Sequence, residues 1–435
     1  MELMDGILSD ENLKLAIKAV KSNKGAAGID KMTVGALDEY FAENGETVKR
    51  SILNKQYKPQ PVRRVYIPKS NGKMRPLGIP TVVDRVVQQA VSQILVKEYE
   101  PHFSEYSYGF RPDRDCHMAI RKVLEYLNDG CEWIVDFDIE KYFDTVNHDK
   151  LISTLREHVN DDKTLHLIRS FLNAGVMEDG MASLTTEGVP QGGPLSPILS
   201  NIYLNKLDRE LEARGLHFVR YADDFDIFVK SEMAADRVMK SVTSWLERKL
   251  FLKVSVTKTK VVRPSQSSFL GFTFWKSTEG WKPKPTDDRK QKLCQKVKGI
   301  LKRKYAVAIP LSVTFTKLNR ILRGWINYFR IGSMKGFLDE FGQWLRHKVR
   351  VIIVKQWKKP MTIYRNLQKL NKLLKCNFSD DDIYKVANSR LGWYRQCGMN
   401  IVNYALSPQV LARANEKEGR PGLVDPLAYY LSGVQ

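Results

Sequence analysis

Two adjacent aspartates lie in the middle of a stretch that otherwise has the composition of a buried strand. The stretch is VRYADDFDIFVKS, residues 219–231, and most of its other residues are β-branched, aromatic or apolar. Carboxylates are poor strand residues, and an unpaired buried charge is strongly destabilising. Asp223 and Asp224 therefore restrict the chain to folds in which something neutralises them. We expect a tight turn at Ala222–Asp224 that brings at least one of them to that partner.

A second acidic pair lies in WIVDFDIEKYFDTVNHD, residues 133–149. Asp136 and Asp138 are two residues apart and would share one face of a strand. If this strand lies beside the one that carries Asp223 and Asp224, the carboxylates form a hard-oxygen site, which favours Mg²⁺ or Mn²⁺ over zinc. Two metals about 3.5–4 Å apart serve in-line phosphoryl transfer in polymerases and nucleases. The residues alone do not choose between Asp136 and Asp138.

Two further segments have patterns that suit a phosphorylated ligand. In VYIPKSNGKMRPLGIP, residues 65–80, we expect a hairpin around residues 70–72, with Lys69 and Arg75 on its arms. These two cations either grip a triphosphate or are simply solvated. In EGVPQGGPLSPILSN, residues 187–201, Gln191 precedes two glycines that let the backbone approach a neighbour closely. Ser196 is expected to cap the following helix, and Gly215 to end it.

The positive charge of the chain is concentrated in one segment. The net charge is +21, yet residues 1–280 contain 39 basic and 39 acidic residues, whereas residues 281–360 contain 21 basic and 4 acidic residues. A neutral body with one strongly basic segment indicates a polyanionic partner, most simply nucleic acid. The Pro-punctuated stretch WKPKPTDDRK, residues 281–290, predicts a hinge between an α+β part and a helical part.

The basic segment contains the amphipathic helical pattern LNRILRGWINYFRIG, residues 318–332. Its apolar stripe includes Leu318, Leu322 and Trp325, and arginines fall on the opposing face. We expect that face to contact phosphates.

No apolar run approaches the roughly 18 residues that cross a bilayer, and the N-terminus is acidic, so we expect no membrane partner and a cytoplasmic location. Five scattered cysteines without a CxxC pair argue against a disulfide framework and a Cys-based zinc site.

Nine motifs follow one another in an order that resembles a known family. They are KGAAGID, IPKSNGKMRPLGIP, SYGFRPDRD, FDIEKYFD, GVPQGGPLSPILSN, RYADD, KVSVTKTK, FLGF and LNRILRGWINYF. Together they resemble the reverse transcriptases of bacterial group II introns, which double as maturases. The sequence contains no cluster of Cys pairs and His of the kind found in the family's endonuclease domain. In this respect it resembles the compact lineage of the family, which lacks that domain.

The resemblance implies an α+β right-hand polymerase with fingers and palm, an α-helical thumb, and a small C-terminal domain. The implied boundaries are 1–284 for fingers and palm with an N-terminal extension at 1–60, 285–360 for the thumb or maturase domain, and 361–435 for a DNA-binding domain.

The resemblance also implies roles for particular residues. The catalytic metal ligands would be Asp138, Asp223 and Asp224 with the backbone of Ile139. Nucleotide-binding residues would be Lys69, Arg75, Phe143, Gln191 and Lys258, with Phe143 against the sugar 2′ position and Lys260 as an alternative to Lys258. The primer grip would be Phe269, Leu270, Gly271 and Phe272, and the RNA-binding arginines Arg320, Arg323 and Arg330. Asp226, where an apolar residue is expected, would be solvated or would support the ligands from behind.

The implied function is an RNA-directed DNA polymerase that copies its intron RNA into cDNA and assists splicing. Its partners would be the group II intron RNA, an RNA template with a DNA primer, target DNA, deoxynucleoside triphosphates and Mg²⁺. Two alternatives remain open on the sequence. One is a domesticated or CRISPR-associated reverse transcriptase freed from any intron, and the other a maturase acting only as an RNA-binding splicing factor. An RNA-dependent RNA polymerase is disfavoured, because Phe143 should exclude ribonucleotides.

Overall fold

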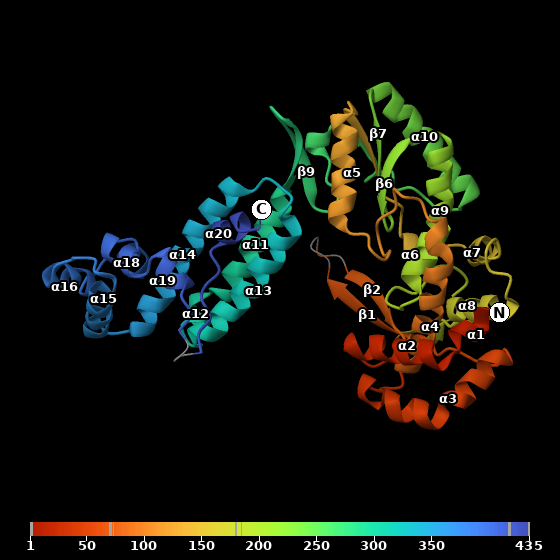
Figure 1. Ribbon diagram of the computed structural model, residues 1–435, viewed down its shortest axis with the longest axis horizontal. Coiled ribbons are helices and arrows are strands. Elements are labelled where there is room, and N and C mark those ends of the chain that lie inside the picture. The colour runs from red at the N-terminus through yellow and green to blue at the C-terminus, as the bar shows by residue number, and fades with distance from the viewer. Residues whose placement is uncertain are drawn as a thin grey trace. The chain divides into compact units, whose positions relative to one another are not determined.

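The computed structural model describes residues 3–68, 72, 74–178, 181–183, 185–415 and 419–433. The chain divides into two compact units, Met1–Phe269 and Leu270–Gln435. Each unit has its own helices and strands, as Figure 1 shows. Each also has its own hydrophobic core. In the described ranges, no helix is long and apolar enough to cross a membrane.

The N-terminal unit mixes helices with two four-stranded sheets, in the orders β2-β1-β4-β5 and β6-β7-β3-β8. Its strands are β1 Val62–Pro68, β2 Met74–Ile79, β3 Trp133–Phe137, β4 Val176–Glu178, β5 Met181–Ser183, β6 His217–Tyr221, β7 Asp224–Val229 and β8 Lys260–Val262. Its α-helices are α1 Leu3–Ile7, α2 Asp10–Ser22, α3 Leu37–Leu53, α4 Val82–Tyr99, α5 Cys116–Asn128, α6 Tyr142–Thr145, α7 His148–Leu155, α8 Asp162–Asn173, α9 Ser196–Ala213 and α10 Glu232–Lys249. Both predicted strands that carry aspartates therefore belong to one sheet, where β3 and β7 are antiparallel neighbours.

The alternation of side chains along β3 and β7 separates a core face from a polar face. Phe137 and Phe225 lie opposite each other in the register and stack with ring centres 4.8 Å apart. Asp136 lies opposite Asp226 in the same register, so these two carboxylates share the other face. The polar face therefore crosses the sheet from β3 to β7.

The predicted turn at the aspartate pair is confirmed. β6 ends at Tyr221 and β7 begins at Asp224, and the two residues lie opposite each other. Ala222 between them has φ +61°, the left-handed region that a non-glycine residue adopts only when its surroundings hold it there.

Arg220 is the group that holds this turn. Its side chain is fully buried, and its Nε donates to Asp208 Oδ1 on α9 at 2.7 Å. The Nη1 atom donates to the Ala222 carbonyl at 2.8 Å and to Asn201 Oδ1 at 3.0 Å. A bidentate carboxylate partner and further hydrogen bonds are what a buried guanidinium requires. The turn is thus anchored to the helix beneath the sheet.

The predicted hairpin and the glycine loop meet in the first sheet. β1 and β2 are antiparallel, with Pro68 opposite Met74, which confirms the hairpin; its tip, with Lys69, lies outside the described residues. Gly78 on β2 donates its N–H to the Gln191 carbonyl at 2.7 Å. A Cβ on Gly192, whose φ is +119°, would lie 2.5 Å from the Gly78 carbonyl oxygen, so glycine is needed for this close approach.

One capping prediction is wrong by one residue. Ser196 is the first residue of α9, and the cap is Leu195, which makes no side-chain capping hydrogen bond. The Ser196 hydroxyl donates instead to the Pro190 carbonyl at 2.5 Å, so it fixes the loop that precedes the helix. Gly215, with φ +66°, follows the helix end as predicted.

The C-terminal unit is a hairpin followed by helices. Its elements are β9 Phe272–Ser277, β10 Gly280–Pro285, α11 Asp287–Ile300, α12 Arg303–Ala306, α13 Leu311–Phe329, α14 Lys335–Trp357, α15 Pro360–Leu374, α16 Asp380–Ala387, α17 Trp393–Gln396, α18 Asn400–Ala405, α19 Pro408–Ala412 and α20 Pro426–Leu431. The predicted hinge at 281–290 is wrong, because residues 280–285 form a strand paired with β9 and α11 begins at Asp287. Prolines are tolerated there since the strand lies at the edge of a two-stranded sheet.

Residues 318–329 of the amphipathic pattern form the C-terminal part of α13, which ends at Phe329. Leu318, Leu322, Ile326 and Phe329 are buried, which confirms the apolar stripe, and Trp325 is half-buried. The core of this unit joins α13 to α11 and α14 through Leu318 and Leu322, with Trp325 packed against it.

We predict that Asp208→Ala destabilises the N-terminal unit by about 3–5 kcal/mol, because it leaves the Arg220 guanidinium buried without its carboxylate. Chemical denaturation of the full chain would measure this. In the double variant Asp208→Leu/Arg220→Met, an apolar pair replaces both charges, and most of the lost stability should return. A single variant as stable as the wild type would show that the pair does not anchor the turn.

Candidate active site

Asp223 and Asp224 are presented by the turn between β6 and β7. Burial raises the pKa of Asp223, while the Arg75 guanidinium lowers it and the charge of Asp138 raises it further. The pKa of Asp224 rises to about 7, first because the surrounding protein displaces water from its carboxylate and then because Asp223, Asp136 and Asp138 repel its charge. The sequence prediction that these carboxylates lie near one another is thus supported by their electrostatic coupling.

Asp138 lies directly after β3 and is fixed by the segment 253–259. Its backbone N–H donates to Thr259 Oγ1 at 3.2 Å, and its carbonyl accepts from the Ser255 N–H at 2.8 Å. Ile139 forms an isolated bridge with Val254. Lys258 Nζ lies 2.8 and 2.9 Å from the two carboxylate oxygens of Asp138. The predicted nucleotide-binding lysine and the predicted metal ligand therefore form an ion pair.

Asp136 belongs to a different set of contacts. Lys260, which lies opposite Asp136 on β8, places its Nζ 3.6 Å from Asp136 Oδ2. Burial raises the pKa of Asp136, and the Lys260 charge opposes that rise. The two lysines that the sequence left open are thus distinguished, since Lys258 pairs with Asp138 and Lys260 with Asp136.

Asp226 is not solvated, which excludes one of the two expectations for it. It is 2% exposed, and its Oδ2 has no hydrogen-bond partner in the part of the chain that the structure describes. Burial raises its pKa well above the usual range, and the charges of Asp136 and Asp224 add to that rise. A carboxyl in this position is favoured in its protonated form.

Arg75 and Gln191 are joined in a chain of hydrogen bonds. Arg75 Nε donates to Gln191 Oε1 at 3.0 Å, and Gln191 Nε2 donates to Asp144 Oδ1 at 3.4 Å. Because Arg75 also acts on the pKa of Asp223, this chain connects the hairpin to the aspartate turn. Lys69, the other predicted triphosphate contact, lies outside the described residues.

Phe143 and Gln191 line one cavity of about 300 Å³. Phe143 is half-buried, packs edge-on against Tyr142 at 5.2 Å, and its carbonyl accepts from the Val189 N–H at 2.6 Å. Arg64 and Tyr66 from β1 line the same cavity. Neither residue was predicted from the sequence, although the alternation along β1 places both on the same face of the strand.

The predicted primer-grip segment, residues 269–272, lies where the two compact units join in sequence. Phe269 is buried in the first unit. In the second, the Leu270 carbonyl accepts from the Tyr328 hydroxyl at 2.9 Å, and Phe272 packs against Tyr328 and Phe329 on α13. Gly271 has φ +82°, and a Cβ there would lie 2.8 Å from Arg289 Nε.

The predicted RNA-binding arginines differ in exposure. Arg320 and Arg323 are exposed on α13, opposite its buried stripe. Arg330 is half-buried at the end of the helix, where its guanidinium carbon lies 5.5 Å from the centre of the Tyr429 ring. Its side chain therefore packs within the unit, unlike those of the other two.

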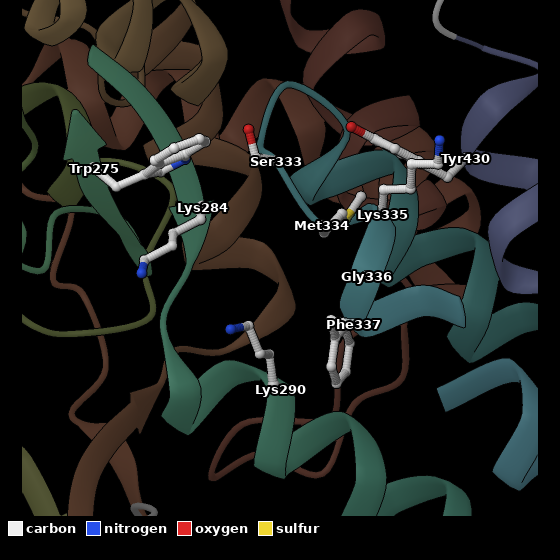
Figure 2. Close-up of a pocket in the computed structure, with 9 residues that line it drawn as sticks. All are labelled: Trp275, Lys284, Lys290, Ser333, Met334, Lys335, Gly336, Phe337 and Tyr430. Atoms are coloured by element: carbon white, nitrogen blue, oxygen red, sulfur yellow. The ribbon is translucent and has the colours of Figure 1, made fainter. Parts of the chain in front are cut away.

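A cavity of about 520 Å³ in the C-terminal unit adjoins the β9–β10 hairpin. Figure 2 shows Trp275 and Lys284 of the hairpin on one side of it, Phe337 of α14 on the other, and Lys290 of α11 below. Lys290 is paired with Asp287 at 2.9 Å. Cations beside aromatic rings are typical of surfaces that contact nucleic acid.

Arg220, Asp208 and Asn201 were also not predicted from the sequence. The sequence signal that could have identified Arg220 is its charge, since it lies in a strand-like stretch two positions before Ala222. The partner on α9 could not be chosen from sequence, because several polar residues of that helix had similar spacing.

The donor set of the aspartate turn fits a divalent cation, although its carboxylates are not assembled around one. Within the described ranges, no group of three or more His, Cys, Asp or Glu side chains is arranged to hold a metal ion. The observation that favours a cation is the raised pKa of Asp224, to which three neighbouring carboxylates contribute. Carboxylate oxygens are the ligands that Mg²⁺ and Mn²⁺ prefer.

Two protein-family models match the chain. Residues 67–274 match "Reverse transcriptase (RNA-dependent DNA polymerase)", and residues 290–371 match "Group II intron, maturase-specific domain". The class that the fold and these matches define is a reverse transcriptase with palm and fingers followed by a helical maturase domain. Reverse transcriptases are nucleotidyl transferases that use divalent metal ions, and both domains imply RNA and other nucleic acid as partners.

Two relatives agree with these matches. The chain is 36% identical to "Protein YkfC" of Escherichia coli (strain K12), over 59% of this chain and 77% of that protein. It is 34% identical to "Group II intron-encoded protein LtrA" of Lactococcus lactis subsp. cremoris, over 59% of this chain and 54% of that protein. The chain therefore belongs to the group II intron reverse transcriptase and maturase family, and it spans about half the length of LtrA.

One solved structure aligns only weakly. A chain of the "Partial Cas6-RT-Cas1--Cas2 complex" has a TM-score of 0.37 and 23% identity, covering 57% of this chain and 43% of that chain. This likeness is too weak to bear on fold or function.

We predict that Asp224→Asn raises the melting temperature of the metal-free protein at pH 8, because it removes a carboxylate that its neighbours repel. The shift should be a few degrees, since about 1 kcal/mol corresponds to about 2–4 °C in a mid-sized domain. The raised folded-state pKa makes this penalty greatest above about pH 7, and it should disappear toward the unfolded value of 3.8 as the carboxylate takes up a proton.

Addition of Mg²⁺ at pH 8 should stabilise the wild type and stabilise Asp224→Asn much less. Asp236→Asn is the matched control, because this exposed aspartate on α10 lies outside the cluster. If the control and Asp224→Asn respond alike to pH and Mg²⁺, the turn is not a cation site.

Proposed function

We propose that this chain is an RNA-directed DNA polymerase that copies its group II intron RNA into cDNA and assists the splicing of that RNA by binding it. The observation that carries the proposal is the aspartate turn, in which Arg220 holds Asp223 and Asp224 against carboxylates that raise the pKa of Asp224. Such repulsion is tolerated where a divalent cation offsets it. The substrates would be an RNA template with a DNA primer, and deoxynucleoside triphosphates.

We assign the metal-binding role to Asp138, Asp223 and Asp224 with the backbone of Ile139, and Mg²⁺ as the ion. Bound Mg²⁺ would supply Lewis-acid stabilisation of the attacking and leaving oxygens in an in-line displacement. Both oxygens of Asp138 accept from Lys258 Nζ, and a cation that took both of them would displace Lys258. The released ammonium would then be free to hold a phosphate or to donate a proton to the departing pyrophosphate.

The nucleotide would be selected by residues around the hydrogen bonds that join Arg75, Gln191 and Asp144. Arg75, already hydrogen-bonded to Gln191, would bind the triphosphate together with Lys69. Phe143 would lie against the sugar and exclude a 2′-hydroxyl, because its backbone is fixed by the loop at Val189. A steric selector has to be held rigidly, since a ring that can swing aside discriminates little.

The C-terminal unit would bind the nucleic acid. Arg320 and Arg323 on the exposed face of α13 would contact phosphates, with Arg330 in a supporting position above Tyr429. Residues 269–272 would hold the primer end, and the module at 361–435 would bind target DNA.

Primer extension tests the polymerase assignment. With an RNA template, a DNA primer, deoxynucleotides and Mg²⁺, we predict that Asp223→Ala lowers extension by about a hundredfold or more, because a metal ligand is lost. The variant should keep the RNA affinity of the wild type, measured on the same template–primer. Asp236→Ala is the matched control and should extend normally. Extension by Asp223→Ala at more than a few per cent of the wild-type rate would contradict the assignment of Asp223 as a ligand of the catalytic metal ions.

A second prediction concerns Phe143. In Phe143→Ala the sugar pocket opens, and the preference for deoxyribonucleotides over ribonucleotides should fall by about tenfold. Single-nucleotide incorporation with each nucleotide measures this ratio. Phe41→Ala is a matched control, because Phe41 is also half-buried and edge-on to a neighbouring tyrosine, Tyr40, at 5.7 Å. An unchanged ratio in Phe143→Ala would assign the selection to another residue.

A further inference from the structure

The C-terminal unit contains a second cavity, of about 230 Å³, separate from the one in Figure 2. It is bounded by α11, by the start of α12, by α14 and by α17. Leu301 and Val351 form a buried apolar floor, being 6% and 2% exposed. None of the motifs singled out in the sequence lies in this cavity.

Four cations line the cavity without an acidic neighbour. They are Lys298, Lys302, Arg303 and Lys348, and the lining contains no carboxylate. Over the residues that the structure describes, none of the four makes an ion pair with Asp or Glu. Lys348 is half-buried, whereas Lys298, Lys302 and Arg303 are exposed, so the cavity opens to solvent on the side of these three cations. Like charges held together around an apolar floor repel one another, and an anion in the cavity relieves that repulsion.

Two aromatic rings form the walls beside these cations. Lys298 Nζ lies 6.0 Å from the centre of the Trp344 ring, and Lys348 Nζ lies 5.0 Å from that of Tyr394. Trp344 is half-buried, whereas Tyr394 is 54% exposed and is held edge-on by His347 at 4.1 Å. An exposed ring fixed in orientation next to cations suits a flat, apolar group that is attached to an anion.

We propose that this cavity binds one unpaired nucleotide of a single-stranded or bulged nucleic acid, with its phosphate on the four cations and its base against Tyr394. The proposal rests on the proposed function, since it assumes that the unit binds nucleic acid. A paired base cannot lie against Tyr394 in this way, because both of its faces are covered by its neighbours in the stack. An acidic peptide would satisfy the cations but would leave the ring and the apolar floor without a partner.

Paired hairpins test the proposal on the full chain. The probes are one RNA hairpin with a single bulged nucleotide and the same hairpin without it, and the corresponding two DNA hairpins. The wild type should bind the bulged hairpin about tenfold more tightly, as stacking of one base implies. A preference in RNA and DNA alike assigns recognition to base and phosphate, and a preference in RNA alone adds the 2′-hydroxyl; either result supports the proposal.

Matched variants locate the preference in the cavity. Lys298→Gln/Lys302→Gln should remove the preference for the bulged hairpin. Tyr394→Ser should also remove this preference but should leave the salt dependence of binding unchanged. Lys296→Gln/Lys304→Gln removes the same charge from exposed lysines outside the cavity. This control should weaken binding of both hairpins equally and keep their ratio. Thermal melting of every variant checks that each is folded.

Three results would overturn the proposal. They are equal affinity of the wild type for bulged and unbulged hairpins, loss of the preference in the lysine control, and displacement of the bulged hairpin by a glutamate-rich peptide as readily as by unlabelled RNA. If the wild type extends primers but shows no preference, the cavity assignment alone fails. If it neither binds RNA nor extends primers, the proposed function fails with it.

Discussion

The buried ion pair between Arg220 and Asp208 is the contact on which the rest of the candidate site depends. It joins the sheet to α9 and, through the Ala222 carbonyl, fixes the turn that presents Asp223 and Asp224. A buried pair of this kind adds little stability beyond what an apolar pair would give, but it allows only one arrangement of its partners. The chain therefore uses it to specify geometry at the point where two carboxylates have to be held together.

The carboxylates around that turn differ in whether a lysine is paired with them. Asp138 is paired with Lys258 and Asp136 with Lys260, whereas at Asp224 burial and the repulsion of three neighbouring carboxylates outweigh the charge of Lys258 and raise the pKa to about 7. Asp226 lies behind them, buried and favoured in its protonated form. This asymmetry distinguishes a candidate cation site from a structural salt-bridge network, in which each charge has its partner.

The C-terminal unit differs from the N-terminal unit in its excess of positive charge. It contains most of the chain's excess positive charge, and its helices place apolar residues inward and cations outward, as Arg320 and Arg323 show on α13. Where cations gather without carboxylates beside aromatic rings, as around Tyr394, the surface has the composition that single-stranded nucleic acid recognition uses. The family assignment and the charge distribution therefore agree on the kind of partner.

The sequence by itself determined the two strand segments that carry the aspartates, the hairpin at residues 65–80, the turn at Ala222 and the apolar stripe of α13, because these depend on local periodicity and turn chemistry. It also determined the family through ordered motifs. Only the tertiary structure decided that Lys258 pairs with Asp138 and Lys260 with Asp136, that Asp226 is buried, and that Arg220 anchors the turn. Residues 281–285 were misread as a hinge because strand pairing with β9 outweighs the local preference of their prolines. Such outcomes depend on which residues meet across the fold, and that information is absent from any short stretch of sequence.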